Sequence, residues 1–167
     1  MTVPAELLGT REVTTAADMD VLGRAIGAAL APGDVVVLNG PLGAGKTTLT
    51  RGIGAGLGIR GPVQSPTFVL ARTHPSLVDG PPLVHVDAYR LGSAVELDDL
   101  DIDVDRSVVV VEWGGGMAEH LTDAWWEIDL VRQTGGRGID TACGDLSRAS
   151  ADLDADAPRT VTISRRP

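Results

Sequence analysis

Residues 35–47, VVVLNGPLGAGKT, decide the fold class of this chain. They begin with a continuous β-branched and aliphatic run, which is typical of a strand buried on both faces of a sheet. The next eight residues fit the pattern G-x-x-x-x-G-K-[ST], and residues 46–57 predict a helix that Gly58 ends. Strand, glycine loop and helix in this order are the context of a phosphate-binding loop, so we expect an α/β P-loop NTPase fold.

The glycine loop predicts that a nucleotide is bound. Glycines let the backbone pass close to phosphate oxygens and adopt positive φ angles. Successive amide N–H groups then point at the anion, and the positive end of the helix dipole adds to the attraction. We expect Lys46 to reach the β and γ phosphates and the Thr47 hydroxyl to bind Mg²⁺. The alternative is a glycine-rich turn that binds no ligand.

The remaining pattern predicts a single domain over residues 1–167, with a mostly parallel central sheet flanked by helices. Residues 14–30 carry apolar side chains at helical spacing, behind a capping box of Thr15 and Asp18. The segment at about 133–158 is rich in Gly, Asp, Ser and Ala and is interpreted as a flexible insert. Further strands are expected within 65–73, after an opening turn, at 83–87 and 107–112, and as a late antiparallel pair at 125–132 and 159–166.

Two of the expected strands end in an acid: LVHV leads into Asp87, and SVVVV leads into Glu112. Ligands of open α/β folds bind at the carboxyl ends of the strands, so both acids are expected beside the phosphate loop. We expect Asp87 to hold the metal through its water shell, and Glu112 to contact the metal or to align the attacking water. The plainer interpretation of each is a surface acid at a strand end.

Two neighbours of these acids have structural interpretations. His85 alternates with Val84 and Val86, so it is expected on the opposite face of the strand as a structural residue. Arg90 is expected to pair with an acid rather than to act as an arginine finger.

Composition and charge limit the other functions of the chain. Its 167 residues, 43% of them hydrophobic, suffice for one domain with one core. The formal net charge is −9 and Lys46 is the only lysine, so we expect poor direct binding of RNA. No secretory signal or long apolar run is seen, and Cys143 has no second cysteine to pair with, so a cytoplasmic protein is expected.

Several motifs follow one another with short spacers: GPLGAGKTTLTRGIGAGLG, VQSPTFVL, HVDAYRL, VEL and VVVVEW. In this combination the chain resembles the bacterial tRNA threonylcarbamoyladenosine biosynthesis ATPase family (TsaE) over residues 14 to about 132. The resemblance implies a Mg²⁺-dependent ATPase required for threonylcarbamoyladenosine modification of tRNAs that read codons beginning with A. It also implies two partners, a threonylcarbamoyl-transferase subunit and its scaffold homologue, with tRNA reached only through the complex. We expect slow hydrolysis by the chain alone.

The resemblance also implies the residues of the site. Thr67, in SPTF, would be a switch-like threonine, and Mg²⁺ would lie near Thr47 and Glu112. The implied catalytic residues are Lys46, Thr67, Asp87 and Glu112. The implied contacts with ATP are Leu42, Gly43, Ala44, Gly45, Lys46, Thr47, Thr48, Asp87, Trp113 and Arg159.

Two departures from the family pattern affect this site. The family follows Glu-Trp with Pro and an acid, whereas this chain has EWGGG, so we expect the loop after Glu112 to be more mobile than usual. The insert at about 133–158 also leaves two matches, Arg137 and Arg159, for a Gly-Arg that lies near the nucleotide in the family. Arg159 is favoured because it leads straight into TVTI.

Three other functions remain as alternatives. A small-molecule or nucleotide kinase usually has a lid carrying arginines, but residues 60–100 hold only Arg60, Arg72 and Arg90, well separated. A GTPase usually selects guanine with an Asn-Lys-x-Asp run, which a chain with a single lysine at position 46 does not contain. A nucleotide-gated binding module differs only in whether hydrolysis is needed. The kinase is the alternative that we retain.

Overall fold

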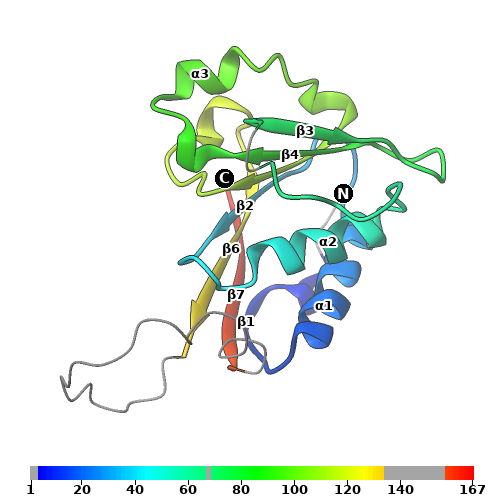
Figure 1. The fold of residues 1–167 in the computed structure, drawn as a ribbon, viewed down its shortest axis with the longest axis vertical. Helices are drawn as coiled ribbons and strands as arrows, with labels where there is room; N and C mark the ends of the chain where they lie inside the picture. The colour runs from blue at the N-terminus through cyan, green and yellow to red at the C-terminus, as the bar shows by residue number, and fades with distance from the viewer. Residues whose placement is uncertain (1–3, 67–68, 134–156) are drawn as a thin grey trace, which may run out of the picture.

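In the computed structural model, which describes residues 4–66, 69–133 and 157–167, the chain forms a seven-stranded mixed sheet (Figure 1). The strand order is β1-β7-β6-β2-β5-β4-β3. Helices pack on both faces of the sheet, so the expected α/β fold class is confirmed.

The centre of the sheet is parallel and sets the position of the two acids. It consists of β6 (Trp125–Arg132), β2 (Val35–Asn39), β5 (Val108–Glu112) and β4 (Leu83–Asp87). In β2 and β5 the valines are buried on both faces, as their continuous aliphatic runs predicted. The register of β4 and β5 places Asp87 directly opposite Glu112 at the carboxyl ends of the two strands.

Antiparallel strands complete both edges of the sheet. β7 (Arg159–Arg166) pairs with β6 and with β1 (Gly9–Val13), and β3 (Ala71–His74) pairs with β4. The predicted late pair at 125–132 and 159–166 therefore occurs with its predicted bounds.

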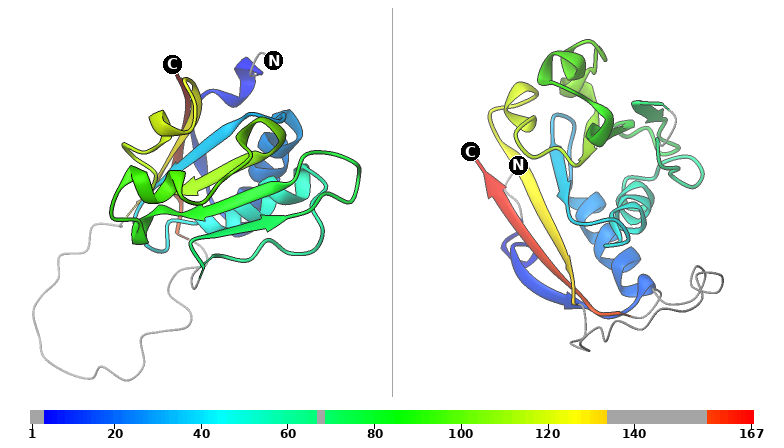
Figure 2. Two further views of the ribbon diagram at one scale, coloured as in Figure 1. Left: turned by 90° about the horizontal axis from the view of Figure 1, so that it is seen from above. Right: turned by 60° about the vertical axis from the view of Figure 1, so that its left-hand side comes forward.

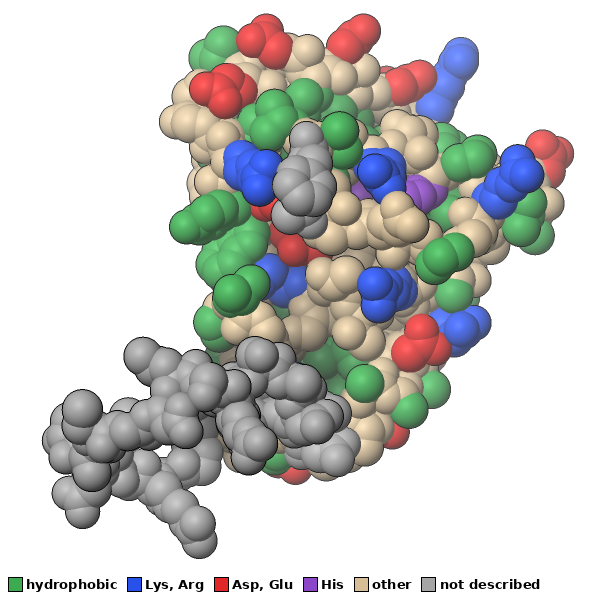
Figure 3. Space-filling view, viewed as in Figure 1, with side chains coloured by type: hydrophobic (Ala, Val, Ile, Leu, Met, Phe, Trp, Pro, Cys, Tyr) green, Lys and Arg blue, Asp and Glu red, His purple; other side chains and the backbone are tan. Residues whose placement is uncertain are grey.

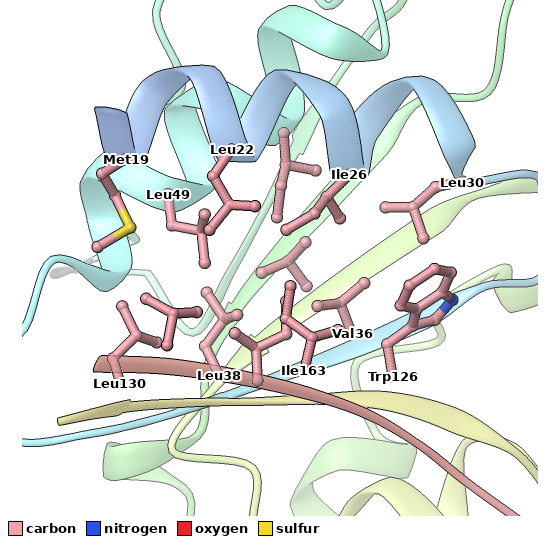
Figure 4. Close-up of a cluster of buried hydrophobic side chains, with 14 of the residues drawn as sticks. Met19, Leu22, Ile26, Leu30, Val36, Leu38, Leu49, Trp126, Leu130 and Ile163 are labelled. Atoms are coloured by element: carbon pink, nitrogen blue, oxygen red, sulfur yellow. The ribbon is translucent and has the colours of Figure 1, made fainter. Parts of the chain in front are cut away.

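Two long helices cover one face of the sheet (Figures 1 and 2). α1 (Ala16–Ala29) presents Met19, Leu22 and Ile26 to the strands, and α2 (Lys46–Gly56) packs beside it (Figure 4). The partners of these side chains in the sheet include Val36, Leu38, Trp126, Ile128, Leu130 and Ile163. Thr15 and Asp18 form the expected capping box of α1, and hydrogen bonds from the Thr15 and Thr14 hydroxyls lower the pKa of Asp18.

The other face is covered by shorter segments. α3 (Ala94–Asp98) and its neighbours bury Val84, Val86, Val109 and Val111 beneath Leu91 and Leu97. The 3₁₀ helices are η1 (Ala5–Leu7), η2 (Ala88–Arg90), η3 (Val104–Arg106) and η4 (Ala118–His120). Among the described residues, no helix has the length and apolar character needed to cross a membrane.

The sequence interpretation missed β1 and α3. In β1 only Val13 is buried, and the strand is held by its backbone pairing with the distant β7, so it carries no periodic apolar signal. The strand expected after an opening turn within 65–73 is Ala71–His74, and Val69 N donates to Pro66 O ahead of it.

Glycines lie at the packing contact between α1 and α2. A Cβ added to Gly27 would lie 2.2 Å from the Ile53 carbonyl oxygen, and one added to Gly23 would lie 2.6 Å from the Leu49 carbonyl oxygen. These contacts are with backbone atoms, which cannot move aside as a flexible side chain would. The two helices therefore approach at a distance that only glycine permits.

We predict that Gly27→Ala destabilises the protein by about 1–3 kcal/mol, because overpacking separates the helices. Helix propensity alone predicts the opposite effect, because alanine stabilises a helix interior by about 1 kcal/mol relative to glycine. Gly92→Ala is the control, because there the nearest atom is the far end of the exposed Glu96 side chain, at 3.1 Å. Urea unfolding of both variants measures the effect, and a Gly27→Ala protein as stable as the wild type would contradict the packing argument.

Candidate functional site

The phosphate loop joins the carboxyl end of β2 to α2. Gly45, the N-cap of α2, has φ +102°, a left-handed conformation that side chains disfavour. The following Lys46 is only 5% exposed, and its ammonium folds back to donate to Gly40 O at 2.8 Å and Pro41 O at 3.1 Å. The loop thus surrounds the Lys46 ammonium at the N-terminal, positive end of α2. This arrangement attracts phosphate.

The surroundings of Lys46 are aromatic and acidic. Its Nζ lies 3.9 Å from the centroid of the Trp113 ring. Burial lowers the pKa of Lys46, and the negative charges of Glu112 and Asp87 act in the opposite direction. Both acids are therefore close enough to interact with the lysine of the loop, as their strand-end positions predicted.

The two acids are held differently. Asp87 is partly exposed and caps η2, where its Oδ1 accepts a hydrogen bond from Tyr89 N at 3.1 Å. Glu112 is only 7% exposed, and its Oε1 lies 2.9 Å from His85 Nε2. Glu112 thus has a buried hydrogen-bond partner. The sequence interpretation did not foresee this partner and considered only the mobility of the loop that follows Glu112.

The loop after Glu112 begins with a constrained tryptophan. Trp113 has φ +62°, a conformation that is uncommon for residues other than glycine, and its N–H donates to Leu38 O at 3.0 Å. Its ring lies 5.5 Å from that of Tyr89, at an interplanar angle of 55°. Gly114 is buried, and Met117 N donates to its carbonyl, closing a turn. The backbone turn thus aims Trp113 at Lys46.

Arg159 contacts the phosphate loop from β7. It opens β7, is 8% exposed, and donates from one guanidinium nitrogen to Gly43 O at 3.4 Å and from the other to Ala157 O at 2.6 Å. Arg159 therefore lies beside the phosphate loop, and its match to the family's Gly-Arg stays a prediction. Arg137 lies outside the described residues.

These side chains surround one cavity of about 620 Å³, on the face where Figure 3 shows basic side chains close to recessed acidic ones. Of the residues predicted from sequence, Ala44 is buried and does not line the cavity, and Thr67 lies outside the described residues. The predicted residues that line the cavity are Leu42, Gly43, Gly45, Lys46, Thr47, Thr48, Asp87, Glu112, Trp113 and Arg159.

The sequence interpretation did not place three other lining residues in the site: Ser65, Tyr89 and Arg90. Each belongs to a motif that was recognised, Ser65 to SPTF and the other two to DAYR. Their position inside these motifs was the available signal. The sequence likewise carried no sign that His85, interpreted as a structural residue, contacts Glu112, because cross-strand pairing brings the two together.

The residues present fit a nucleoside triphosphate with Mg²⁺. The cavity offers the Thr47 hydroxyl and the Glu112 and Asp87 carboxylates, and oxygen atoms are the ligands that Mg²⁺ prefers. The described residues contain no cluster of three or more His, Cys, Asp or Glu that could hold a metal. Mg²⁺ needs none when phosphate oxygens and water supply most of its ligands.

Comparison with known proteins gives consistent matches. The family model described as "Threonylcarbamoyl adenosine biosynthesis protein TsaE" matches residues 13–139. A Streptomyces coelicolor protein named "tRNA threonylcarbamoyladenosine biosynthesis protein TsaE" is 55% identical over 149 residues, which cover 87% of this chain and 89% of that protein. A protein with the same name from Mycobacterium tuberculosis is 50% identical, and the match covers 74% of this chain and 79% of that protein. One from Bacillus subtilis is 37% identical, and the match covers 70% of this chain and 80% of that protein.

The crystal structure of Bacillus subtilis YdiB aligns with a TM-score of 0.63 and 28% identity, covering 92% of this chain and 82% of that one. The family match spans more than half of the chain, and the relatives agree in name over most of their length. The chain therefore belongs to the TsaE family of tRNA threonylcarbamoyladenosine biosynthesis proteins.

Proposed function

We propose that this protein binds and hydrolyses ATP with Mg²⁺, and that it does so within tRNA threonylcarbamoyladenosine biosynthesis together with a transferase subunit and its scaffold homologue. The observation that carries the proposal is the meeting of the phosphate loop and both strand-end acids in one cavity. A phosphate loop alone would support binding, whereas the two acids supply what hydrolysis needs besides.

The loop side of the cavity binds the triphosphate. The amides of residues 42–47 and the N-terminus of α2 face the phosphates, and Lys46 exchanges its two carbonyl acceptors for phosphate oxygens. Arg159, whose guanidinium donates to Gly43 O, contributes a second cation beside the loop. When bound, Mg²⁺ would offset the negative charge that develops on the phosphates.

The residues at the strand ends would bind the metal and orient the water. The Thr47 hydroxyl and the Glu112 carboxylate hold the metal, and Asp87 accepts hydrogen bonds from its water shell. Glu112 is also the group best placed to orient an attacking water, since its carboxylate borders the cavity and has one oxygen already fixed by His85.

The mouth of the cavity supports a role for partner proteins. Leu42 is 92% exposed and Tyr89 is 74% exposed, and both line the cavity. A partner that covers these apolar side chains would exclude water from the site and strengthen its electrostatic interactions. We therefore expect partners to raise turnover by closing the mouth, rather than by fixing Glu112, which His85 already holds.

The proposal predicts that the isolated chain hydrolyses ATP slowly, and that adding the transferase and scaffold subunits changes this rate. It also predicts loss of threonylcarbamoyladenosine from tRNA when the protein is depleted from cells. Steady-state ATPase assays with and without the partners, and nucleoside analysis of total tRNA, are the measurements. Normal modification after depletion would remove the pathway assignment, and a fast rate that the partners leave unchanged would remove the coupling.

Asp87→Ala and Glu112→Ala should each retain most of the ATP affinity and lose about 10²–10⁴-fold in hydrolysis rate, because both acids act on metal and water. Lys46→Ala is the comparison variant and should lose binding itself, since Lys46 contacts the phosphates directly. Calorimetry and single-turnover hydrolysis separate the two effects. Wild-type hydrolysis in either acid variant would show that its acid has been misassigned.

Arg159→Ala should weaken ATP binding about 10-fold or more, because a hydrogen bond to a charged group contributes about 1.5–3 kcal/mol. Arg137→Ala is the matched control and should bind ATP like the wild type. Calorimetric titration of both variants, with thermal unfolding to confirm their folding, measures the difference. Weaker binding by Arg137→Ala alone would reverse the assignment of the second cation.

A further inference from the structure

A buried histidine stands directly behind the candidate metal site. His85 lies in the middle of β4, is fully buried, and places Nε2 at 2.9 Å from Glu112 Oε1. The alternation of β4 puts Leu83, His85 and Asp87 on the face covered by α2, with Val84 and Val86 in the opposite core. His85 does not border the cavity, so it can reach the chemistry only through Glu112.

The surroundings of the ring decide which nitrogen carries the proton. Nδ1 is buried and has no hydrogen-bond partner among the described residues. A proton on Nδ1 would leave a buried N–H donor unpaired and would direct the bare Nε2 lone pair at a carboxylate oxygen. A proton on Nε2 removes both penalties, because Nε2–H then donates to Glu112 Oε1.

We infer that His85 is a positioning residue for Glu112: its imidazole donates from Nε2 to Oε1 and so fixes the carboxylate, leaving Oε2 as the oxygen directed to metal and water. This inference rests on the proposed ATPase function for its consequence, but the hydrogen bond itself does not. Such a hydrogen bond orients the carboxylate and leaves its other oxygen available to the metal.

The location of the proton is tested on the unliganded wild-type chain by ¹⁵N NMR of labelled histidine. The chain has three histidines, His74, His85 and His120, so single substitutions of the other two assign the His85 signals. We expect a protonated Nε2 that is hydrogen-bonded to the carboxylate. An unprotonated Nε2 would overturn the inference, whether or not the protein hydrolyses ATP.

The functional consequence is tested by variants that keep or remove the donor. His85→Leu should lower the single-turnover rate about 10–100-fold and raise the Mg²⁺ concentration needed for half-maximal rate, as losses of such outer partners do. Its ATP affinity measured in EDTA should stay at the wild-type value. His85→Gln, which retains an N–H donor at nearly the same reach, should recover much of the rate and of the Mg²⁺ response.

His74→Leu is the matched control. His74 lies on the neighbouring strand β3 and is 7% exposed, but the structure gives it no hydrogen bond to either acid. It should leave the rate and the Mg²⁺ response unchanged. Equal kinetic losses in His85→Leu, His85→Gln and His74→Leu, in proportion to their losses of thermal stability, would show a packing role and overturn the inference.

A double-variant cycle shows whether His85 acts through Glu112. In a Glu112→Gln background, His85→Leu should cause no further loss of rate, because the group that it positions has already been changed. Losses that multiply would overturn the inference. If the wild-type chain neither binds nor hydrolyses ATP, the proposed function fails, and the NMR measurement still decides the His85–Glu112 hydrogen bond.

Discussion

The parallel register of three strands, β4, β5 and β2, is the constraint on which the site depends. Asp87 pairs with Glu112 across β4 and β5, and Leu38 pairs with Glu112 across β5 and β2, so the three strands end at one level. The phosphate loop leaves β2 one residue beyond that level. A slip of one residue would turn every side chain of a strand to the other face, and would carry its acid away from the loop. The strand pairing that sets this register therefore also positions the chemistry.

That register also explains a polar pair within an apolar layer. Val108, Val110 and Glu112 share the face of β5 that packs beneath α2, so the carboxylate emerges at the end of a hydrophobic row. A buried carboxylate needs a partner, because leaving it without one costs far more than burying an apolar group. His85, on the same face of β4, supplies the hydrogen bond. The requirement of folding and the requirement of the site are met by the same contact.

The parts that could be predicted from sequence are those with local signals. VVVLN and VVVV indicate buried strands by composition, the glycine loop indicates a phosphate site by its pattern, and Thr15 with Asp18 indicates the start of a helix. The parts that could not be predicted depend on contacts between distant segments. β1 exists because it pairs with β7, and the contact of His85 with Glu112 follows from the pairing of β4 with β5. The contact of Arg159 with Gly43 O likewise joins two segments that are far apart in the chain.

The contacts of Lys46 connect the two halves of the cavity. Its ammonium donates hydrogen bonds to two loop carbonyls and lies over the Trp113 ring. Trp113 follows Glu112 directly, and its N–H donates to Leu38 O of β2. Phosphate oxygens make stronger acceptors for an ammonium than neutral carbonyls do, so an arriving triphosphate can draw Lys46 away from these contacts. The ring contact is worth about 0.5–2 kcal/mol, which phosphate binding can offset. Occupation of the loop would then free Trp113, which has a constrained backbone and stands beside the exposed Tyr89. If the proposed function holds, the exchange that binds the nucleotide would therefore also affect the aromatic residues that line the cavity, Trp113 and Tyr89.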